Sequence, residues 1–221
     1  MHVTFPHQLI AQGARFALIG QTRIAQESIS GASTVIASLA ARWSASVTFV
    51  IRDEAGHLAF RAFMAGLEGM LGTTDVPAFA RYRPLDQNGR ALTRCTVASL
   101  ADAQTMEHFG FENAEIEGAQ LAADAALRAT DLQVTESATT GIRPGHRFSI
   151  GDRLHEVQLA WTDGARRLRV QPPLRAAALS GAQLNLFAPI CRMRRADDAD
   201  PGYDDRMTRQ QSITLSFIEA L

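Results

Sequence analysis

The most regular pattern in the sequence is the alternation of apolar and polar residues over 42–51, "RWSASVTFVI". Successive side chains of a β-strand point to opposite faces, so the alternation predicts a strand with one buried face. That face would carry Trp43, Ala45, Val47, Phe49 and Ile51, with Ser44, Ser46 and Thr48 on the other. Two shorter apolar runs, 14–19 and the weaker 33–39, are further candidate strands.

The period changes over residues 53–72, "DEAGHLAFRAFMAGLEGMLG", which predict the main helix. Large apolar residues recur there every three or four positions, the spacing of one helix face. They are Phe60, Phe63, Met64, Leu67 and Leu71. Asp53 can cap the first turn, Glu54 favours its positive end, and Gly72 can close the last turn. So wide an apolar stripe requires a sheet to pack against.

The middle of the chain is mostly β in character. Residues 73–90 are loop-like, with two prolines and the turn signal Asn88-Gly89. Residues 91–100 are a candidate strand. The alanines of 119–134 favour helix by propensity, but the spacing does not decide, and we favour short strands and turns.

Residues 141–157, "GIRPGHRFSIGDRLHEV", predict a turn, a strand, a second turn and another strand. The apolar residues move from even to odd positions near 155–156, which indicates a bulge or turn there. One face would carry Phe148, Ile150 and Leu154 and fill a barrel, with Arg147 and Arg153 outward. The other would carry Val157, Leu159 and Trp161.

The remaining segments complete the β pattern. A hairpin turn at 162–164 leads to a return strand over 166–171, which Pro172 and Pro173 stop. Residues 174–195 predict a loop, a turn at Gly181, and a strand in which Leu184 and Leu186 alternate with Asn185. An acidic loop over 196–205 precedes a closing strand over 212–221, with Ile213, Leu215 and Phe217 inward. This last strand can return to the N-terminal sheet, which would leave the middle as an insertion.

Composition places the chain among ordinary globular proteins. It has 221 residues and a formal net charge of −1, so no electrostatic case exists for a nucleic-acid or anionic-membrane partner. All 22 of its Lys and Arg residues are arginine. We interpret Cys95 and Cys191 as semi-buried thiols in a reducing cytoplasm. We expect no secretion signal, no membrane span, and a soluble protein.

Three groups of ionisable residues are candidates for chemistry, and each has a simpler interpretation. His146, Asp152 and His155 could converge on a metal across a turn, but exposed polar residues on a hairpin are the favoured interpretation. Asp197, Asp198, Asp200 and Asp204 are acidic enough for calcium but lack its loop spacing. Asp53, Glu54 and Glu68 could form a glycosidase carboxylate pair, but the first two have capping roles and Glu68 should face water.

Motifs for the common enzyme classes do not occur in the sequence. A phosphate loop of the G-x-x-x-x-G-K-[ST] type needs a lysine, and neither G-x-S-x-G nor H-E-x-x-H is present. We therefore predict no catalytic, cofactor-binding or metal-binding residues and a structural or interaction protein that is not an enzyme. A barrel that binds glycans or a receptor is the alternative, and a cell-wall hydrolase with an unrecognised site is a third hypothesis.

The order of several degenerate motifs resembles the distal tail protein family of long-tailed, siphovirus-type bacteriophages. An Arg-Trp strand (42–49) precedes a helix with "AF…L.G" (59–72), and "F.IG.RL..V" (148–157) follows. "PPLR" (172–175) then precedes an "L…P" strand and a closing strand that ends in Glu219. The resemblance covers most of the chain.

This resemblance implies a mainly β fold: a tail-tube-like β-sandwich or barrel with one packed helix, and a small inserted β-barrel. Residues 1–92, completed by 206–221, would form the ring domain, and 93–205 the insertion. It also implies a structural virion protein that assembles in the host cytoplasm into a ring, usually of six subunits. That ring would join the tail tube to the hub and tip of the baseplate, with no cofactor.

Overall fold

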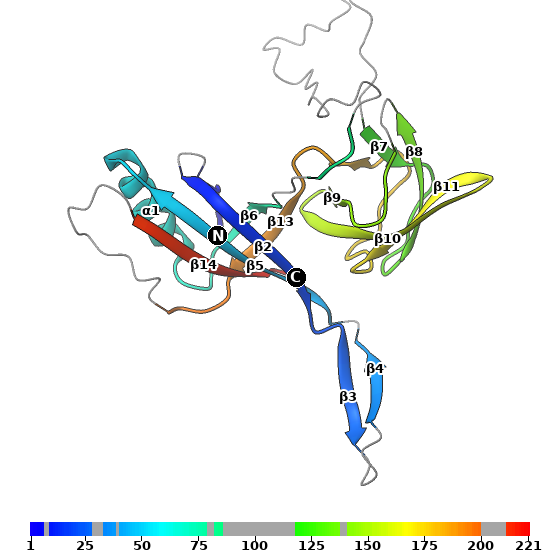
Figure 1. Cartoon of the computed structure of the whole chain (residues 1–221), viewed down its shortest axis with the longest axis horizontal. Helices are drawn as coiled ribbons and strands as arrows, with labels where there is room; N and C mark the ends of the chain where they lie inside the picture. The colour runs from blue at the N-terminus through cyan, green and yellow to red at the C-terminus, as the bar shows by residue number, and fades with distance from the viewer. Residues whose placement is uncertain are drawn as a thin grey trace, which may run out of the picture. The chain divides into compact units, whose positions relative to one another are not determined.

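A computed structural model describes residues 1–6, 9–27, 33–38, 40–78, 82–85, 118–137, 141–199 and 211–221 (Figure 1). These residues form a mainly β protein with fourteen strands and one helix. Internal contacts divide the chain into a first unit, Met1–Phe79 with Ile190–Leu221, and a second unit, Ala80–Pro189. No helix in the described ranges is both long and apolar enough to cross a membrane. The predicted strand over 91–100 and its Cys95 lie outside the described residues.

The first unit is built on a six-stranded sheet whose members come from both ends of the chain. In spatial order the strands are β1 (His2–Val3), β6 (Thr73–Pro77), β13 (Ile190–Arg195), β14 (Gln211–Glu219), β5 (Arg42–Ile51) and β2 (Ile10–Ile19). The closing strand β14 lies between β5 and β13, antiparallel to both, and buries the three residues expected to point inward. Strand β13 pairs in this first sheet, although it falls within the predicted insertion over 93–205.

The alternation over 42–51 appears in β5 as predicted. Its five expected apolar side chains are all buried, whereas Ser44, Ser46 and Thr48 are only partly covered. The outward hydroxyls meet their equivalents on β14: the Oγ1 atoms of Thr48 and Thr214 lie 2.9 Å apart. One face of this sheet is thus apolar and the other carries small polar side chains.

Helix α1 (Glu54–Leu67) lies beside the six-stranded sheet (Figure 1). Its aromatic side chains pack against the apolar face of that sheet. The Phe60 and Phe49 ring centres are 6.4 Å apart, and Phe5 lies 5.7 Å from Phe49 and 6.0 Å from Phe63. Such offset and edge-to-face pairs add to the free energy gained by burying the rings. The cap is also as expected, since Asp53 Oδ1 accepts a 2.8 Å hydrogen bond from the Gly56 N–H.

The helix ends earlier than the periodicity predicts. Leu67 is its last residue, Glu68 adopts a left-handed conformation with φ of 46°, and Leu71 is 77% exposed. The inclusion of Leu71 in the buried stripe was therefore wrong. Gly72 does close this end, because its N–H donates to the Leu67 carbonyl at 2.8 Å.

Residues 73–77 are strand β6 and not part of a loop, so that prediction was also wrong. β6 pairs in parallel with β1 and antiparallel with β13, and its Thr74 and Val76 are fully buried. Five residues with one proline carry little strand signal of their own, and the two neighbouring strands supply the pairing. Strands β3 (Thr22–Glu27) and β4 (Ser33–Ala37) pair with each other as a separate two-stranded sheet.

The second unit is a nearly closed six-stranded β-barrel. Its strands, in spatial order, are β12 (Gln183–Leu184), β7 (Gly118–Leu121), β8 (Asp131–Ser137), β11 (Ala165–Gln171), β10 (Arg153–Asp163) and β9 (Arg147–Ile150). Two backbone hydrogen bonds between Ser149 and Asn185, of 3.1 and 2.8 Å, join the two ends of this sheet. The prediction of short strands and turns over 119–134 is confirmed by β7 and β8.

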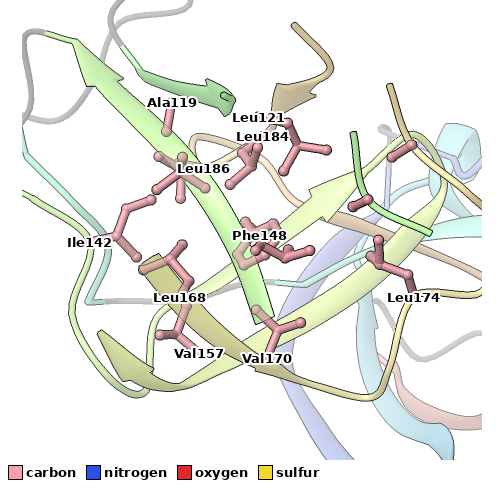
Figure 2. Close-up of a cluster of buried hydrophobic side chains, with 14 residues drawn as sticks. Ala119, Leu121, Ile142, Phe148, Val157, Leu168, Val170, Leu174, Leu184 and Leu186 are labelled. Carbon is pink, nitrogen blue, oxygen red and sulfur yellow. The ribbon is translucent and has the colours of Figure 1, made fainter. Parts of the chain in front are cut away.

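The barrel interior is filled by a cluster of apolar side chains (Figure 2). Phe148, Leu168 and Ile142 are fully buried in it, and the expected Leu184 and Leu186 also contribute. The burial of these apolar side chains is the main favourable contribution to the folding of the barrel.

Two assignments in the barrel hairpin were wrong because of its turn. Gly151 and Asp152 make a two-residue turn that pairs Ile150 with Arg153 and Phe148 with His155. Paired residues share a face, so His155 and not Leu154 continues the interior set. Leu154 is buried on the opposite face of β10, outside the interior cluster.

The predicted bulge exists but lies slightly later, between Val157 and Leu159. Val157 therefore still points inward, opposite Val170. Beyond the bulge Ala160 packs against the core, and Leu159 is 52% exposed. The grouping of Val157 with Leu159 and Trp161 was wrong for this reason, since a bulge shifts the face assignment by one residue.

Gly72 should be intolerant of any side chain. A Cβ at this position would lie 2.7 Å from the Leu67 carbonyl oxygen and 2.8 Å from its Cα. We expect Gly72→Ala to lower the free energy of unfolding of the first unit by about 1–3 kcal/mol, because the chain must shift to relieve the overlap. Urea unfolding followed by the fluorescence of buried Trp43 measures the loss.

Gly13→Ala is the matched control, because a Cβ there meets nothing within 4 Å. Equal stability of the Gly72→Ala variant and the wild type would contradict the close approach.

Candidate functional site

The stretch over 141–157 lies across one end and one wall of the barrel. Its first turn spans 143–146, where the His146 N–H donates to the Arg143 carbonyl at 3.1 Å. The Gly145 N–H donates to Val157 at 2.7 Å from a backbone with φ of +87°, which favours glycine. This turn holds the start of β9 beside β10.

An ion pair closes the same end of the barrel. Glu136 Oε1 accepts from Arg166 Nε at 3.2 Å and from the Ile142 N–H at 3.1 Å, and Arg166 Nη2 donates to the Ile142 carbonyl at 2.6 Å. The two side chains are only 18% and 30% exposed. The bonds tie β8, β11 and the segment before β9 together around fully buried Ile142.

His146 belongs to this end of the barrel. Its Nδ1 accepts a 3.1 Å hydrogen bond from the Arg143 N–H. Partial burial and the positive charge of Arg143 lower the pKa of His146, and Glu136 opposes this effect. At neutral pH the imidazole is therefore neutral and has a role in the turn.

Asp152 lies at the other end of β9, in the two-residue turn. Its Oδ1 pairs with Arg153 Nε at 3.3 Å, and both side chains are about three-quarters buried. Because the strand β9 separates Asp152 from His146, the three candidate metal ligands of this stretch do not converge. Within the described residues no group of three His, Cys, Asp or Glu side chains could hold a metal ion.

His155 is the largest departure from the expected picture of this stretch. We expected an exposed polar residue, but the side chain is 1% exposed and lies inside the barrel. Its Nδ1 lies 2.9 Å from the Pro172 carbonyl oxygen, and its ring centre lies 5.8 Å from that of Phe148. A two-residue turn places it there, and Gly151-Asp152 was the signal that could have shown this.

The other candidate residues are dispersed over the first unit. Asp53 caps α1, and Glu54 and Glu68 are exposed at its two ends, as expected. Asp197 Oδ1 accepts from the Ala199 N–H at 3.2 Å, and exposed Asp198 lies against Gly69. Asp200 and Asp204 lie outside the described residues.

The full burial of Glu219 and of Cys191 in the first unit was not predicted. Glu219 is 1% exposed and its Oε2 accepts from the Trp43 N–H at 3.0 Å, which joins the last residue of β14 to β5. Cys191 is fully buried, not semi-buried as expected. The two residues of the Trp43–Glu219 hydrogen bond are 176 positions apart in the sequence, so no local pattern could indicate this bond.

The outer wall of the barrel carries an aromatic and cationic surface. Trp161 and exposed Leu159 lie beyond the bulge in β10, opposite Arg167 and Arg169 of β11. The Arg169 guanidinium is 5.9 Å from the Trp161 ring centre, and Asp131 binds it in two-pronged fashion at 2.8 and 3.1 Å. This pairing lowers the pKa of Asp131, mainly through the hydrogen bond from Arg169.

A scan against protein-family models found no match, and neither did a search of curated protein sequences.

The Glu136–Arg166 pair should contribute measurably to barrel stability. Glu136→Ala removes the acceptor of the buried Ile142 N–H and leaves Arg166 without its carboxylate partner, although Arg166 keeps its bond to the Ile142 carbonyl. We expect a loss of about 1–3 kcal/mol in the free energy of unfolding of the second unit, the usual cost of an unsatisfied buried donor. Urea unfolding followed by Trp161 fluorescence measures it.

Arg169→Ala is the matched control, because it breaks a second Arg–carboxylate pair between the same two strands. That pair is nearly half exposed, so water screens it and its loss should cost much less. Similar losses for the two variants would contradict a closing role for the Glu136 pair.

Proposed function

We propose that this protein is a structural subunit of a bacteriophage tail, which assembles into a ring between the tail tube and the tip. The proposal rests first on the order of motifs that resembles the distal tail protein family. The first unit would be the tail-tube-like ring domain and the barrel an accessory domain inserted into it.

The topology of the first unit supports this proposal. Its sheet is interrupted after β6, continues at β13, and is completed by β14 in the centre. The described strands β1 and β2 stand at the two edges of this sheet. In a ring, neighbouring subunits would cover such edges and protect them from uncontrolled pairing.

The single observation that carries the ring is the apolar surface of the β3–β4 hairpin. Among the described strands, β3 and β4 pair only with each other, and Val35 and Ile36 of β4 are 56% and 55% exposed. These two β-branched residues are adjacent, so both faces of β4 are apolar at this point. A neighbouring subunit that covers both would explain why such residues are placed in this hairpin.

Light scattering after size-exclusion chromatography tests the ring with a double variant, Val35→Glu with Ile36→Glu. We expect cyclic oligomers for the wild type and monomers for the variant, since charges on this strand cannot be buried in an interface. Leu127→Glu is the control, because it puts a charge on an exposed leucine of the barrel. A strictly monomeric wild type, alone and with tube and hub proteins, would contradict the proposal.

A barrel that recognises a glycan is the second candidate function, and Trp161 is the observation that favours it. Indole rings stack on sugar rings, and Arg167 beside it can donate hydrogen bonds to hydroxyls or carboxylates. The nearby exposed Leu159 would extend the contact surface.

Binding of purified envelope polysaccharide to the full chain tests this second candidate. Trp161→Ala should reduce affinity at least tenfold, whereas Leu179→Ala, at an exposed leucine of the same unit, should not. Equal binding by all three proteins, or none by the wild type, would contradict it.

A further inference from the structure

Among the described residues of the barrel, the imidazole of His155 is a buried ionisable group that no proposed function uses. It is the interior residue opposite Phe148, two positions before inward-pointing Val157. Its neighbours in the interior cluster are apolar, and only 1% of its surface is exposed. A group that can acquire a charge is thus enclosed in the part of the barrel least able to hold one.

The hydrogen bonds of the ring define where a proton would go. The Pro172 carbonyl can only accept, so Nδ1, 2.9 Å away, carries the hydrogen in the neutral ring. The free lone pair is on Nε2, which is buried and has no hydrogen-bond partner among the described residues. Protonation would therefore create a buried donor without an acceptor as well as a charge.

The charges around the ring oppose protonation. Arg153, in the same hairpin, and Arg175, after the Pro172–Pro173 segment, both act against a positive imidazole. The adjacent carboxylate of Glu156 is on the opposite face of β10, paired at 2.7 Å with Arg147. Burial, and then these two arginines, lower the pKa of His155 to about 4, and the bond to Pro172 only partly offsets them.

We propose that His155 is an acid-sensitive latch of the barrel: protonation at Nε2 puts a charge and an unsatisfied donor into the apolar interior, and the second unit opens to expose them to water while the first unit stays folded. The device does not depend on the proposed function. We expect the effect in the second unit because the described histidines of the first unit are not enclosed. The side chain of His2 is 46% exposed, and His57 on α1 is only partly covered.

The direction of the pH effect follows from linkage. In the open barrel the imidazole titrates near 6.5, and in the closed barrel near 4, so the open form binds the proton first. The closed barrel has its full stability above pH 6.5 and loses it as the pH falls toward 4. Each pH unit in this range changes the opening equilibrium by up to tenfold, and the total change from well above pH 6.5 to well below pH 4 is about 300-fold.

Hydrogen exchange measured by mass spectrometry on the full chain tests the latch, with both units observed in one sample. Amides of β9–β11 report the barrel, and those of β5 and β14 report the first unit. Their ratio cancels the intrinsic effect of pH on exchange. We expect protection of β9–β11 to fall by one to two orders of magnitude between pH 6.5 and 4.5 relative to β5 and β14.

His155→Gln should abolish this relative loss, because the amide can donate to Pro172 but cannot be protonated in this range. His146→Gln, at the start of the same hairpin, should retain it. Parallel loss in both units of the wild type would overturn the proposal, as would a wild-type response in His155→Gln.

A second measurement does not depend on the fold of a variant. In the wild type, the NMR signal of the His155 ring should keep its neutral position down to about pH 5. Titration near pH 6.5 within a folded barrel would overturn the latch.

Discussion

The antiparallel pairing of β14 with β5 is the interaction on which the architecture depends. It runs from Gln211 opposite Ile51 to Ile218 opposite Ser44, and buried Glu219 then accepts from the Trp43 N–H. Because the last strand lies in the middle of the sheet, the first unit cannot be complete until the C-terminal segment is present. The whole second unit is therefore an insertion within a fold that its two ends close.

The barrel is completed within the second unit itself, and none of its described strands comes from either end of the chain. Its ends are joined by the two backbone bonds between Ser149 and Asn185, and the Glu136–Arg166 pair closes one end. The two-residue turn at Gly151-Asp152 then decides which side chains fill it. The closure of the sheet and the register set by this turn together enclose an ionisable residue, His155, in the apolar interior.

The sites predicted from the sequence illustrate how far local patterns reach. The Asp53 cap and the β5 face were correct because each depends on residues within one element. Leu154 and Val157 were misplaced because face assignment in a hairpin depends on the number of turn residues and on the bulge. His155 was misjudged for the same reason, since histidine is intermediate in burial and its identity alone does not indicate which face it occupies.

The sequence by itself determined the mainly β character, the helix capped by Asp53, the barrel hairpin and the inward face of the closing strand. These follow from side-chain period and turn residues, which act over a few positions. Only the tertiary structure decided that residues 73–77 form a strand, that β13 belongs to the first sheet, and that Glu219 is buried. Each of these depends on a partner distant in the sequence, because a short segment becomes a strand, and a polar group can be buried, only where that partner completes its hydrogen bonds.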